Sequence, residues 1–361
     1  MKILLNGYFY TNLGDDLFFH LITRRYPQHI FYVPVHADHA ATYAGSANVK
    51  LLPQTRLRRG MNKLLSKVSD RLSLNRRLCR KTDCAVLIGG SMFQERGDDC
   101  LQRLAQFPRH PGGQYVLGVN FGPHKTQAYV DACRKYLSGV TDVCFRDSVS
   151  HSYFRELPNA RLGSDMVFGI RQLCPAASET QNTCVISLMD FAAKEDLAPY
   201  ADTYYDFLIK TAMQQQKLGR KIILLSFCRM EGDENAMGQF SEKCPPELAK
   251  DVSALYYDGS NYQQLCSCIS SAACLVATRF HSLVLGLAYN IPTIPICYSN
   301  KALQLLQDLG LEAAAIIPAQ LAQAEPTPVT ASGLDRLEAA AEQHFTELDK
   351  RLNESERKDF A

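Results

Sequence analysis

The chain has 361 residues, more than one hydrophobic core usually fills, so we expect two domains. A hydrophobic fraction of 46% is ordinary for a globular protein, and a net charge of +2 argues against a general nucleic-acid-binding protein. No window approaches the apolar length of a membrane span, and the amino terminus lacks the apolar core of a signal peptide. We therefore expect a cytoplasmic protein with no nucleic-acid partner.

The cysteines do not form a recognisable metal or disulfide pattern. There are thirteen of them, their spacing is scattered, and no Cys-x-x-Cys pair occurs. Cys266, Cys268 and Cys274 form the tightest group, but the sequence offers no obvious fourth ligand for zinc. We expect reduced, mostly buried thiols and no metal site.

The first predicted strand, residues 1–7, is followed by a polar loop. Gly14 permits a tight turn in this loop, and Asp15 or Asp16 can cap the helix that follows. A carboxylate at this place can also accept a proton from a substrate hydroxyl. Capping and catalysis therefore both stay open for Asp15 and Asp16.

After a second predicted strand at 30–35 comes the most basic segment of the chain, residues 56–81. It contains ten basic residues and one acidic residue, Asp70, and its leucines and valine follow helical spacing. Such a basic amphipathic helix can lie on an anionic membrane surface. It can equally be a solvated helix with lysine and arginine on its outer face, and both interpretations stay open.

Further strand ends in the first half place polar residues at one edge of the expected sheet. The apolar run 84–88 leads into Gly89, Gly90 and Ser91, which allow a ligand to approach the backbone and add a hydroxyl. This loop is neither a dinucleotide fingerprint, which needs a further glycine, nor a P-loop, which needs a lysine. The strands near 115–120, 141–145 and 161–162 likewise place His124, Arg146 and Asp165 at this edge. Asp147 or Ser148 is expected to cap the helix that follows Arg146.

The second half repeats this alternation after a polar linker at 175–181. Predicted strands lie at 183–188, 221–227, 275–278 and 293–298, and Lys301 follows the last of them. Arg279 and His281 follow the third strand and begin a helix, which is typical of an anion-binding pair at a strand end. Alternatively, Arg279 pairs with a neighbouring carboxylate and His281 caps the helix. We favour the anion site because two adjacent cations repel without an anion or acid partner.

The whole pattern predicts an α/β fold with two doubly wound, Rossmann-like lobes that face a cleft. The expected domains are an N-terminal lobe, 1–174, a C-terminal lobe, 182–330, and a C-terminal segment, 331–361. Apolar positions at helical spacing from 334 to 352 predict that this last segment is an amphipathic helix packed on the body.

Taken in order, these motifs resemble the polysaccharide pyruvyl transferase family over nearly the whole chain. The chain departs from the family pattern at Ser91, where the family often has a third glycine, and at Pro123-His124; both bear on the acceptor more than on the reaction. The matching motifs are Asn12-Leu13-Gly14-Asp15, Leu87-Ile88-Gly89-Gly90-Ser91, Arg146-Asp147-Ser148 with Asp165, Thr278-Arg279-Phe280-His281-Ser282-Leu283, and Ile291-Pro292 ahead of Lys301.

The resemblance implies a fold like that of the B-type glycosyltransferases and a defined reaction. The family moves the enolpyruvyl carbons of phosphoenolpyruvate onto two hydroxyls of a sugar, as a cyclic ketal, without a cofactor. The first lobe would then be the acceptor side and the second lobe the donor side. The acceptor would be a polysaccharide or its lipid-linked precursor. The basic segment 56–81 would suit a lipid-linked acceptor, because it could make peripheral contact with the membrane that carries the lipid.

The resemblance also implies roles for individual residues. Arg279 would hold the donor carboxylate with two parallel hydrogen bonds, and His281 would protonate the methylene carbon or balance the leaving phosphate. Asp15 or Asp165 would take the hydroxyl protons. The other expected substrate-binding residues are Lys301, Arg146, His124, Asn12, Gly89, Gly90 and Ser91.

Two other functions compete with this interpretation. A glycosyltransferase of the same architecture would use a nucleotide-sugar donor and would need a carboxylate of the second lobe to reach the ribose hydroxyls. A sugar-binding protein that has lost its activity is a further alternative. The intact Arg279, His281 and Asp15 count against it.

Overall fold

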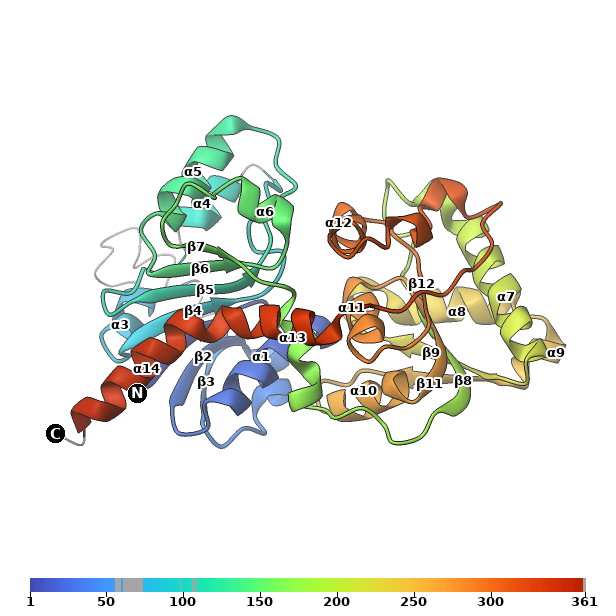
Figure 1. The fold of residues 1–361 in the computed structure, drawn as a ribbon, viewed down its shortest axis with the longest axis horizontal. Helices are drawn as coiled ribbons and strands as arrows, with labels where there is room; N and C mark the ends of the chain where they lie inside the picture. Colours follow the sequence, from blue (N-terminus) through green and yellow to red (C-terminus); the bar gives the residue numbers. More distant parts are fainter. Residues whose placement is uncertain (56–59, 61–73, 98, 106, 108, 360–361) are drawn as a thin grey trace. The chain divides into compact units, whose positions relative to one another are not determined.

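The computed structural model describes residues 1–55, 60, 74–97, 99–105, 107 and 109–359, and its contacts divide the chain into two compact units (Figure 1). Unit 1 comprises Met1–Tyr10, Phe18–Met166 and Leu337–Ala361, and unit 2 comprises Thr11–Leu17 and Val167–Arg336. The linker expected at 175–181 thus lies within unit 2. Most of the basic segment 56–81, with its predicted amphipathic helix, lies outside the described residues.

Unit 1 contains a parallel sheet of seven strands in the order β3-β2-β1-β4-β5-β6-β7. Every residue of β4, β5 and β6 is buried, as expected for parallel strands covered on both faces. The strand order reverses between β1 and β4, which makes their carboxyl ends the switch point where doubly wound sheets bind ligands. The bounds are β1 Lys2–Asn6, β2 Ile30–His36, β3 Val49–Gln54, β4 Cys84–Ile88, β5 Gln114–Val119, β6 Asp142–Phe145 and β7 Ala160–Leu162.

Polar side chains begin several of the helices that connect these strands. Thr126 caps α5, and Asp147 caps α6 by accepting a hydrogen bond from the backbone N–H of Ser150 at 2.7 Å, which confirms one of the two predicted caps. Helix α1 starts in unit 2 and continues in unit 1. The bounds are α1 Leu13–Arg25, η1 Ala37–Tyr43, α3 Leu74–Cys79, α4 Cys100–Ala105, α5 Gln127–Leu137 and α6 Ser148–Ser152.

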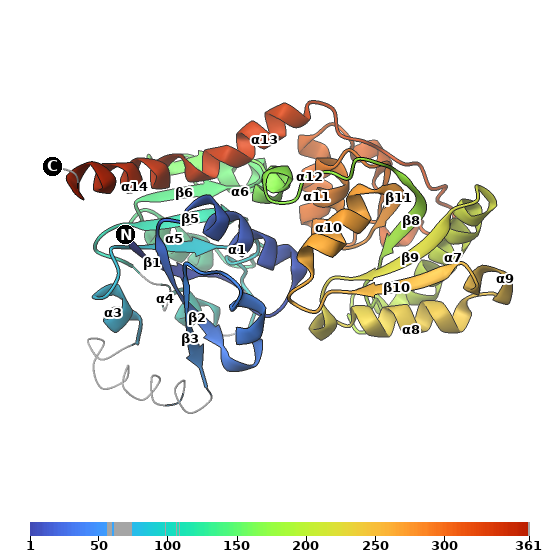
Figure 2. The same ribbon diagram turned by 90° about the horizontal axis from the view of Figure 1, so that it is seen from below.

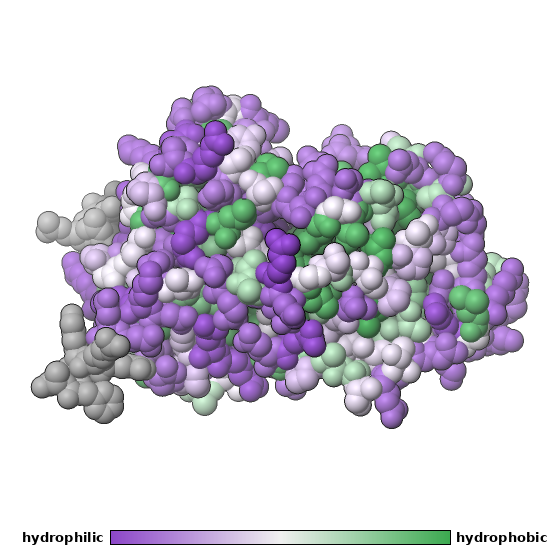
Figure 3. Space-filling model, in the orientation of Figure 1, coloured by the Kyte–Doolittle hydropathy of each residue, from purple (hydrophilic) through white to green (hydrophobic). Residues whose placement is uncertain are grey.

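The single C-terminal helix predicted at 334–352 is in fact two helices, α13 (Leu334–Glu342) and α14 (Thr346–Asp359), joined by a 3₁₀ turn. In Figures 1 and 2, α14 lies along the sheet of unit 1, and Figure 3 shows hydrophilic residues over its visible side. His344 in the turn is fully buried. Its Nδ1 accepts from the backbone N–H of Gly118 at 3.2 Å, and its Nε2 donates to the carbonyl of Ser164 at 2.6 Å. These bonds attach the segment to unit 1.

Unit 2 contains a parallel sheet of five strands in the order β10-β9-β8-β11-β12, so its switch point lies between β8 and β11. The predicted α/β class with two doubly wound sheets is confirmed. The strand bounds are β8 Gln181–Ser187, β9 Lys221–Ser226, β10 Val252–Tyr256, β11 Ala272–Ala277 and β12 Thr293–Pro295. The helix bounds are η3 Met166–Gln172, η4 Ala198–Tyr200, α7 Ala201–Lys217, η5 Arg229–Glu231, α8 Asp233–Lys243, α9 Pro246–Ala249, α10 Tyr262–Ser270, α11 Phe280–Ala288, α12 Asn300–Asp308, η6 Glu312–Ala314 and η7 Pro318–Gln320.

The thirteen cysteines all carry free thiols, and all but Cys79, Cys244 and Cys268 are buried. This confirms that they act as small apolar side chains of the core. Among the described residues, no three His, Cys, Asp or Glu side chains are grouped so that they could hold a metal ion. Within the same residues, no helix has both the length and the apolar character needed to cross a bilayer.

Candidate functional site

Arg279 occupies the junction between β11 and α11 at the switch point of unit 2, and only 6% of it is exposed. One terminal nitrogen of its guanidinium donates to Glu231 and the other donates to Asp233. Burial alone lowers the pKa of Arg279, but Asp233 and Glu231 outweigh it and raise this pKa above its ordinary value. The guanidinium is therefore permanently charged and already neutralised by acid partners.

The two acid partners differ in how firmly they are held. Asp233 is fully buried, and its second carboxylate oxygen accepts from the backbone N–H groups of Phe227 and Cys228 at 2.8 and 3.0 Å. The Glu231 side chain is 34% exposed, and its other oxygen accepts from Asn12 at 3.4 Å. Asp233 is thus fixed by the protein core, whereas Glu231 is the accessible partner.

Glu231 is negatively charged at neutral pH. Burial raises the pKa of Glu231, but Arg279, followed by Lys194 and Lys301, outweighs this effect and lowers the pKa below its ordinary value. In this structure, both guanidinium nitrogens that were expected to bind the donor carboxylate are bonded to protein carboxylates. The alternative interpretation, in which Arg279 pairs with a neighbouring acid, describes this state correctly.

The loop after β1 contributes to the same site, because residues Thr11–Leu17 belong to unit 2. Asn12 is the cap of α1: its side-chain oxygen accepts from the backbone N–H of Gly14 at 3.1 Å. Asp15 and Asp16 lie within the first turn, so the prediction that one of them is the cap residue is wrong. Asp16 is fully buried and accepts from the Tyr257 hydroxyl at 2.9 Å, whereas Asp15 is half-buried.

Gly14 brings two distant motifs into contact. A Cβ atom added to Gly14 would lie 1.8 Å from Nδ1 of His281, far below any tolerated contact. The imidazole of His281 therefore packs directly against the glycine of the first loop, although the two residues are more than 260 positions apart. The absence of a side chain at Gly14 sets the position of this ring.

Two helices of unit 2 begin at neighbouring strand ends without a side-chain cap, α11 after β11 and α12 after β12. The Lys301 ammonium lies 5.1 Å from the ring centroid of Phe280, so the second residue of α12 reaches the first residue of α11. The hydroxyl of Ser299, just before α12, is buried and makes no hydrogen bond to the described residues. The N-termini of α11 and α12, with His281 in the first turn of α11 and Lys301 in the first turn of α12, are suited to an anion.

In unit 1, the predicted residues Arg146 and Asp165 are bound to each other. Their side chains are 2% and 1% exposed, and the guanidinium donates to the carboxylate at 2.9 Å and to Asn120 at 2.7 Å. Ser91 donates to the same Asn120 oxygen at 3.3 Å, and a Cβ on Gly90 would lie 2.4 Å from the guanidinium. Asp165 and Arg146 thus neutralise each other in this structure, and their expected roles as a base and as a phosphate contact would require this pair to separate.

The remaining predicted residues of unit 1 lie in separate surroundings. Gly89 has a positive φ of 130°, a conformation that favours glycine, and its added Cβ would lie 4.0 Å from the backbone nitrogen of Tyr8. The ring of His124 packs against Phe121 and Tyr153 at 5.0 and 5.1 Å. Gly89 thus lies at the switch point of unit 1, whereas His124 belongs to an aromatic cluster.

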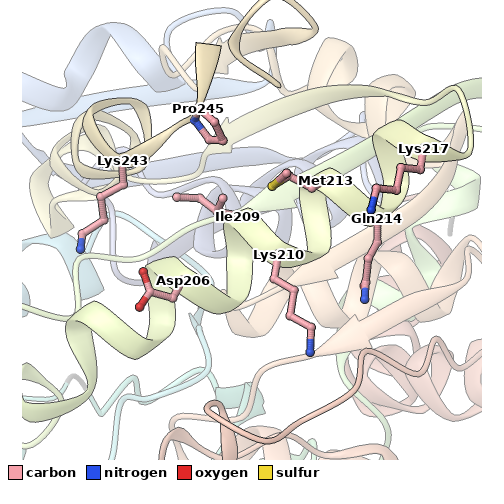
Figure 4. A pocket seen from close by; sticks show the side chains of 8 residues that line it. All are labelled: Asp206, Ile209, Lys210, Met213, Gln214, Lys217, Lys243 and Pro245. Atoms are coloured by element: carbon pink, nitrogen blue, oxygen red, sulfur yellow. The ribbon is translucent and has the colours of Figure 1, made fainter. Parts of the chain in front are cut away.

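A hollow of about 640 Å³ lies on the outer side of α7 and contains none of the predicted residues (Figure 4). Of its lysines, Lys210 pairs with Glu325 at 2.7 Å and Lys243 pairs with Asp202 at 2.9 Å. These ion pairs direct the two charges toward protein carboxylates. The hollow is lined by Asp206, Ile209, Lys210, Met213, Gln214, Lys217, Lys243 and Pro245.

Sequence reasoning missed the importance of Glu231, Asn120 and Tyr257. Glu231 follows β9 in the segment Glu231-Gly232-Asp233, so the rule that functional residues follow strand ends could have identified it. Tyr257 similarly follows β10, a strand that was not predicted. Their partners lie far away in the sequence, and no local signal shows these pairings.

Comparison with known proteins gives a family and a fold. A family model described as polysaccharide pyruvyl transferase matches residues 12–300. A comparison with curated protein sequences finds no match. Among solved structures, UDP-GlcNAc 2-epimerase of Methanocaldococcus jannaschii in complex with UDP-GlcNAc and UDP has a TM-score of 0.58 at 8% identity, over 97% of this chain and 100% of that chain.

Two further similar structures support the same fold. UDP-N-acetylglucosamine 2-epimerase of Rickettsia bellii has a TM-score of 0.54 at 11% identity, over 95% of this chain and 87% of that chain. Anabaena Alr3699/HepE in complex with UDP has a TM-score of 0.50 at 12% identity, over 97% of this chain and 91% of that chain. The likeness identifies the B-type glycosyltransferase architecture.

Proposed function

Because the chain belongs to the polysaccharide pyruvyl transferase family, we propose that this transferase moves the enolpyruvyl unit of phosphoenolpyruvate onto two hydroxyls of one sugar. The product is a cyclic pyruvate ketal, and phosphate is released. The observation that supports the proposal is in unit 2, where α11 begins directly after Arg279, carries His281 in its first turn, and starts beside Lys301 of α12.

The donor's charges match this site. Phosphoenolpyruvate carries a phosphate and a carboxylate, and both need positive partners when they leave water. The phosphate is suited to the N–H groups at the starts of α11 and α12, with Lys301 and the buried Ser299 hydroxyl beside them. The carboxylate then lies toward Arg279.

Arg279 binds the donor carboxylate by exchange of its acid partners. Asp233 stays in place because two backbone N–H groups hold it, and the accessible Glu231 gives way to the donor. The exchange replaces one carboxylate with another, so the guanidinium never loses its neutralising charge. Glu231→Gln is therefore expected to bind phosphoenolpyruvate more tightly than the native protein, because a neutral side chain competes less well for Arg279.

His281 supplies the proton that starts the reaction. Protonation of the donor's methylene carbon makes the adjacent C2 electrophilic, and a sugar hydroxyl attacks it. C2 then loses its bond to the phosphate oxygen and gains a bond to a second hydroxyl oxygen of the sugar. The two sugar hydroxyls lose two protons in total. One balances the proton that the methyl group has gained, and the other leaves with phosphate.

Asp15 is the candidate base for the hydroxyls. It is half-buried in the first turn of α1, in the same loop whose Gly14 contacts His281, whereas Asp165 is buried against Arg146. A carboxylate that remains accessible can take a proton from an attacking hydroxyl. That the acceptor is carried on a membrane lipid remains a prediction, since most of segment 56–81 lies outside the described residues.

Ligand-dependent thermal stability tests the donor assignment. Phosphoenolpyruvate at one hundred times its dissociation constant is expected to stabilise the protein by about 2.7 kcal/mol. UDP-glucose is expected to have no effect, and stabilisation by UDP-glucose alone would contradict the proposal.

Two variants locate the donor. Arg279→Ala is expected to lose most of the stabilisation by phosphoenolpyruvate, because removing one charged partner of a buried anion costs about 2–5 kcal/mol. The matched control is Arg229→Ala, since the Arg229 side chain is 81% exposed, and it should retain the full effect. His281→Ala should still bind the donor but release phosphate far more slowly in the presence of an acceptor.

A further inference from the structure

A group of four aromatic rings, two exposed tyrosines and two half-buried histidines, lies at the carboxyl ends of β1 and β2 in unit 1. Tyr8 and Tyr10, in the segment after β1, are 41% and 36% exposed, and their ring centroids are 4.8 Å apart. His36, the last residue of β2, lies 6.5 Å from the Tyr10 ring at an interplanar angle of 26°, and His39 lies 5.3 Å from it. We call Tyr8, Tyr10, His36 and His39 the aromatic platform.

A buried ring anchors the segment that carries the two tyrosines. Phe9, between the two tyrosines, is buried and packs edge-on against Phe19 and Tyr43 at 6.0 and 5.2 Å. Because Phe9 anchors the segment in the core, Tyr8 and Tyr10 are presented to solvent on the opposite side. The ring of His36 is oriented by a hydrogen bond that its Nδ1 accepts from the backbone N–H of Asp38 at 3.3 Å.

The position of the platform is that of a ligand site rather than of a random surface patch. The strand order of this sheet reverses between β1 and β4, and in such sheets ligands bind outside the carboxyl ends at the reversal. The backbone of Tyr8 lies close to Gly89 in the loop after β4: a Cβ atom added to Gly89 would lie 4.0 Å from the Tyr8 nitrogen. The exposed rings of Tyr8 and Tyr10 contribute little to folding, and their place beside each other after a strand end indicates binding.

The chemistry of the platform fits a sugar ring. One face of a pyranose presents C–H bonds that pack on an aromatic ring, and its edge presents hydroxyls that need donors and acceptors. Burial, followed by the nearby His36, lowers the pKa of His39, so its imidazole is neutral at neutral pH and can both donate and accept. The tyrosine hydroxyls add further polar groups.

We propose that the aromatic platform of Tyr8, Tyr10, His36 and His39 is the subsite that binds a pyranose ring of the acceptor. This inference rests on the proposed function in one respect: only if the protein is a pyruvyl transferase is the bound sugar its acceptor. The binding of a pyranose itself does not require the transfer reaction. The Tyr8 and Tyr10 rings pack on each other at an interplanar angle of 36°, so the outer face of one of them lies on the apolar face of the sugar, and the imidazoles meet its hydroxyls.

The sequence allows a direct test because it contains no tryptophan. Tyr10→Trp therefore introduces one fluorophore at the platform, and its emission can be followed without donor. We expect a saturable change on titration with methyl β-galactopyranoside, methyl β-glucopyranoside or methyl α-mannopyranoside. Sorbitol, an acyclic polyol with similar hydroxyls, should give no such change, and neither should Tyr256→Trp, whose parent tyrosine is exposed in unit 2.

Several outcomes would overturn the inference. They are no saturable change with any pyranoside, an equal change with sorbitol, or an equal change in Tyr256→Trp. A change on addition of anionic vesicles but not of pyranosides would also overturn it and assign the rings to a membrane. If Tyr10→Trp does not fold, Tyr8→Trp serves the same test.

Kinetics then separate this inference from the proposed function. In Tyr8→Ala/Tyr10→Ala the KM for the sugar acceptor is expected to rise about tenfold, because the aromatic contact with the sugar is lost, while the KM for phosphoenolpyruvate stays unchanged. The thermal midpoint should change little because both rings are exposed. If the protein binds pyranosides but transfers nothing from phosphoenolpyruvate, the sugar subsite stands and the proposed function is refuted. If transfer occurs and the double variant has an unchanged KM for the acceptor, the proposed function stands and the subsite is refuted.

Discussion

Replacement of Asp233 by asparagine tests how the candidate site is held together. Asp233 is fully buried and bonds Arg279 through one oxygen and two backbone N–H groups through the other. In Asp233→Asn, the amide nitrogen, itself a donor, must face either the guanidinium or those N–H groups. Removing one partner of a buried ion pair costs about 3–5 kcal/mol, and because Glu231 remains on the guanidinium we expect about 3 kcal/mol.

The matched control is Glu231→Gln at the same guanidinium. The Glu231 side chain is one-third exposed, so solvent compensates for its lost charge and we expect a cost of about 0.5–1 kcal/mol. Urea unfolding measures both variants. Hydrogen exchange adds a local readout at the amides of Phe227 and Cys228, where 3 kcal/mol corresponds to about hundredfold faster exchange.

Two results would contradict these expectations. If Glu231→Gln destabilises the protein as much as Asp233→Asn, the two carboxylates are equivalent and Glu231 is not the exchangeable partner. A cost below about 1 kcal/mol in Asp233→Asn would show that the buried ion pair does not hold the site.

Three further predictions follow from individual contacts. Burial lowers the pKa of His344 from 6.5 to about 4, so on acidification the unfolded chain binds this proton first, and the free energy of unfolding should fall by up to about 3 kcal/mol between pH 6.5 and 4. The urea midpoint of His344→Gln should lose this part of its dependence on pH. An unchanged pH dependence in this variant would contradict the prediction. Gly14→Ala should displace the His281 ring and slow phosphate release. Gly45→Ala is the control, because a Cβ atom added to Gly45 has no neighbour within 4 Å, and it should leave the rate unchanged. Equal rates of phosphate release in the two variants would contradict the contact between Gly14 and His281. Tyr257→Phe removes a hydroxyl from buried Asp16 and should cost about 1–3 kcal/mol in urea unfolding, while the exposed Tyr256→Phe should cost nothing measurable; equal effects would contradict it.

The sequence predicted the strands that are buried on both faces. The runs that form β4 and β11 are almost continuously apolar, because both of their faces pack against helices. The edge strands β3 and β10 were missed for the opposite reason. Their residues are mostly half-buried or exposed, so they show neither an apolar run nor a clear alternation.

The site was predicted in its residue types but not in its pairings. The strand-end rule brought Arg146 and Asp165 to one edge, yet it could not show that they neutralise each other. It also placed Arg279 correctly at the start of α11, but its partners Glu231 and Asp233 come from another strand end, more than 40 residues earlier. Such contacts depend on how side chains pack across the sheet, which periodicity does not describe.

The most direct test of the central claim is the mass of a sugar acceptor after incubation with the purified protein and phosphoenolpyruvate. Methyl pyranosides and lipid-linked oligosaccharides serve as acceptors. We expect a mass gain equal to phosphoenolpyruvate minus phosphoric acid, with one phosphate released for each product, and neither change in His281→Ala. No gain from phosphoenolpyruvate, together with a gain of one hexose from UDP-glucose, would contradict it.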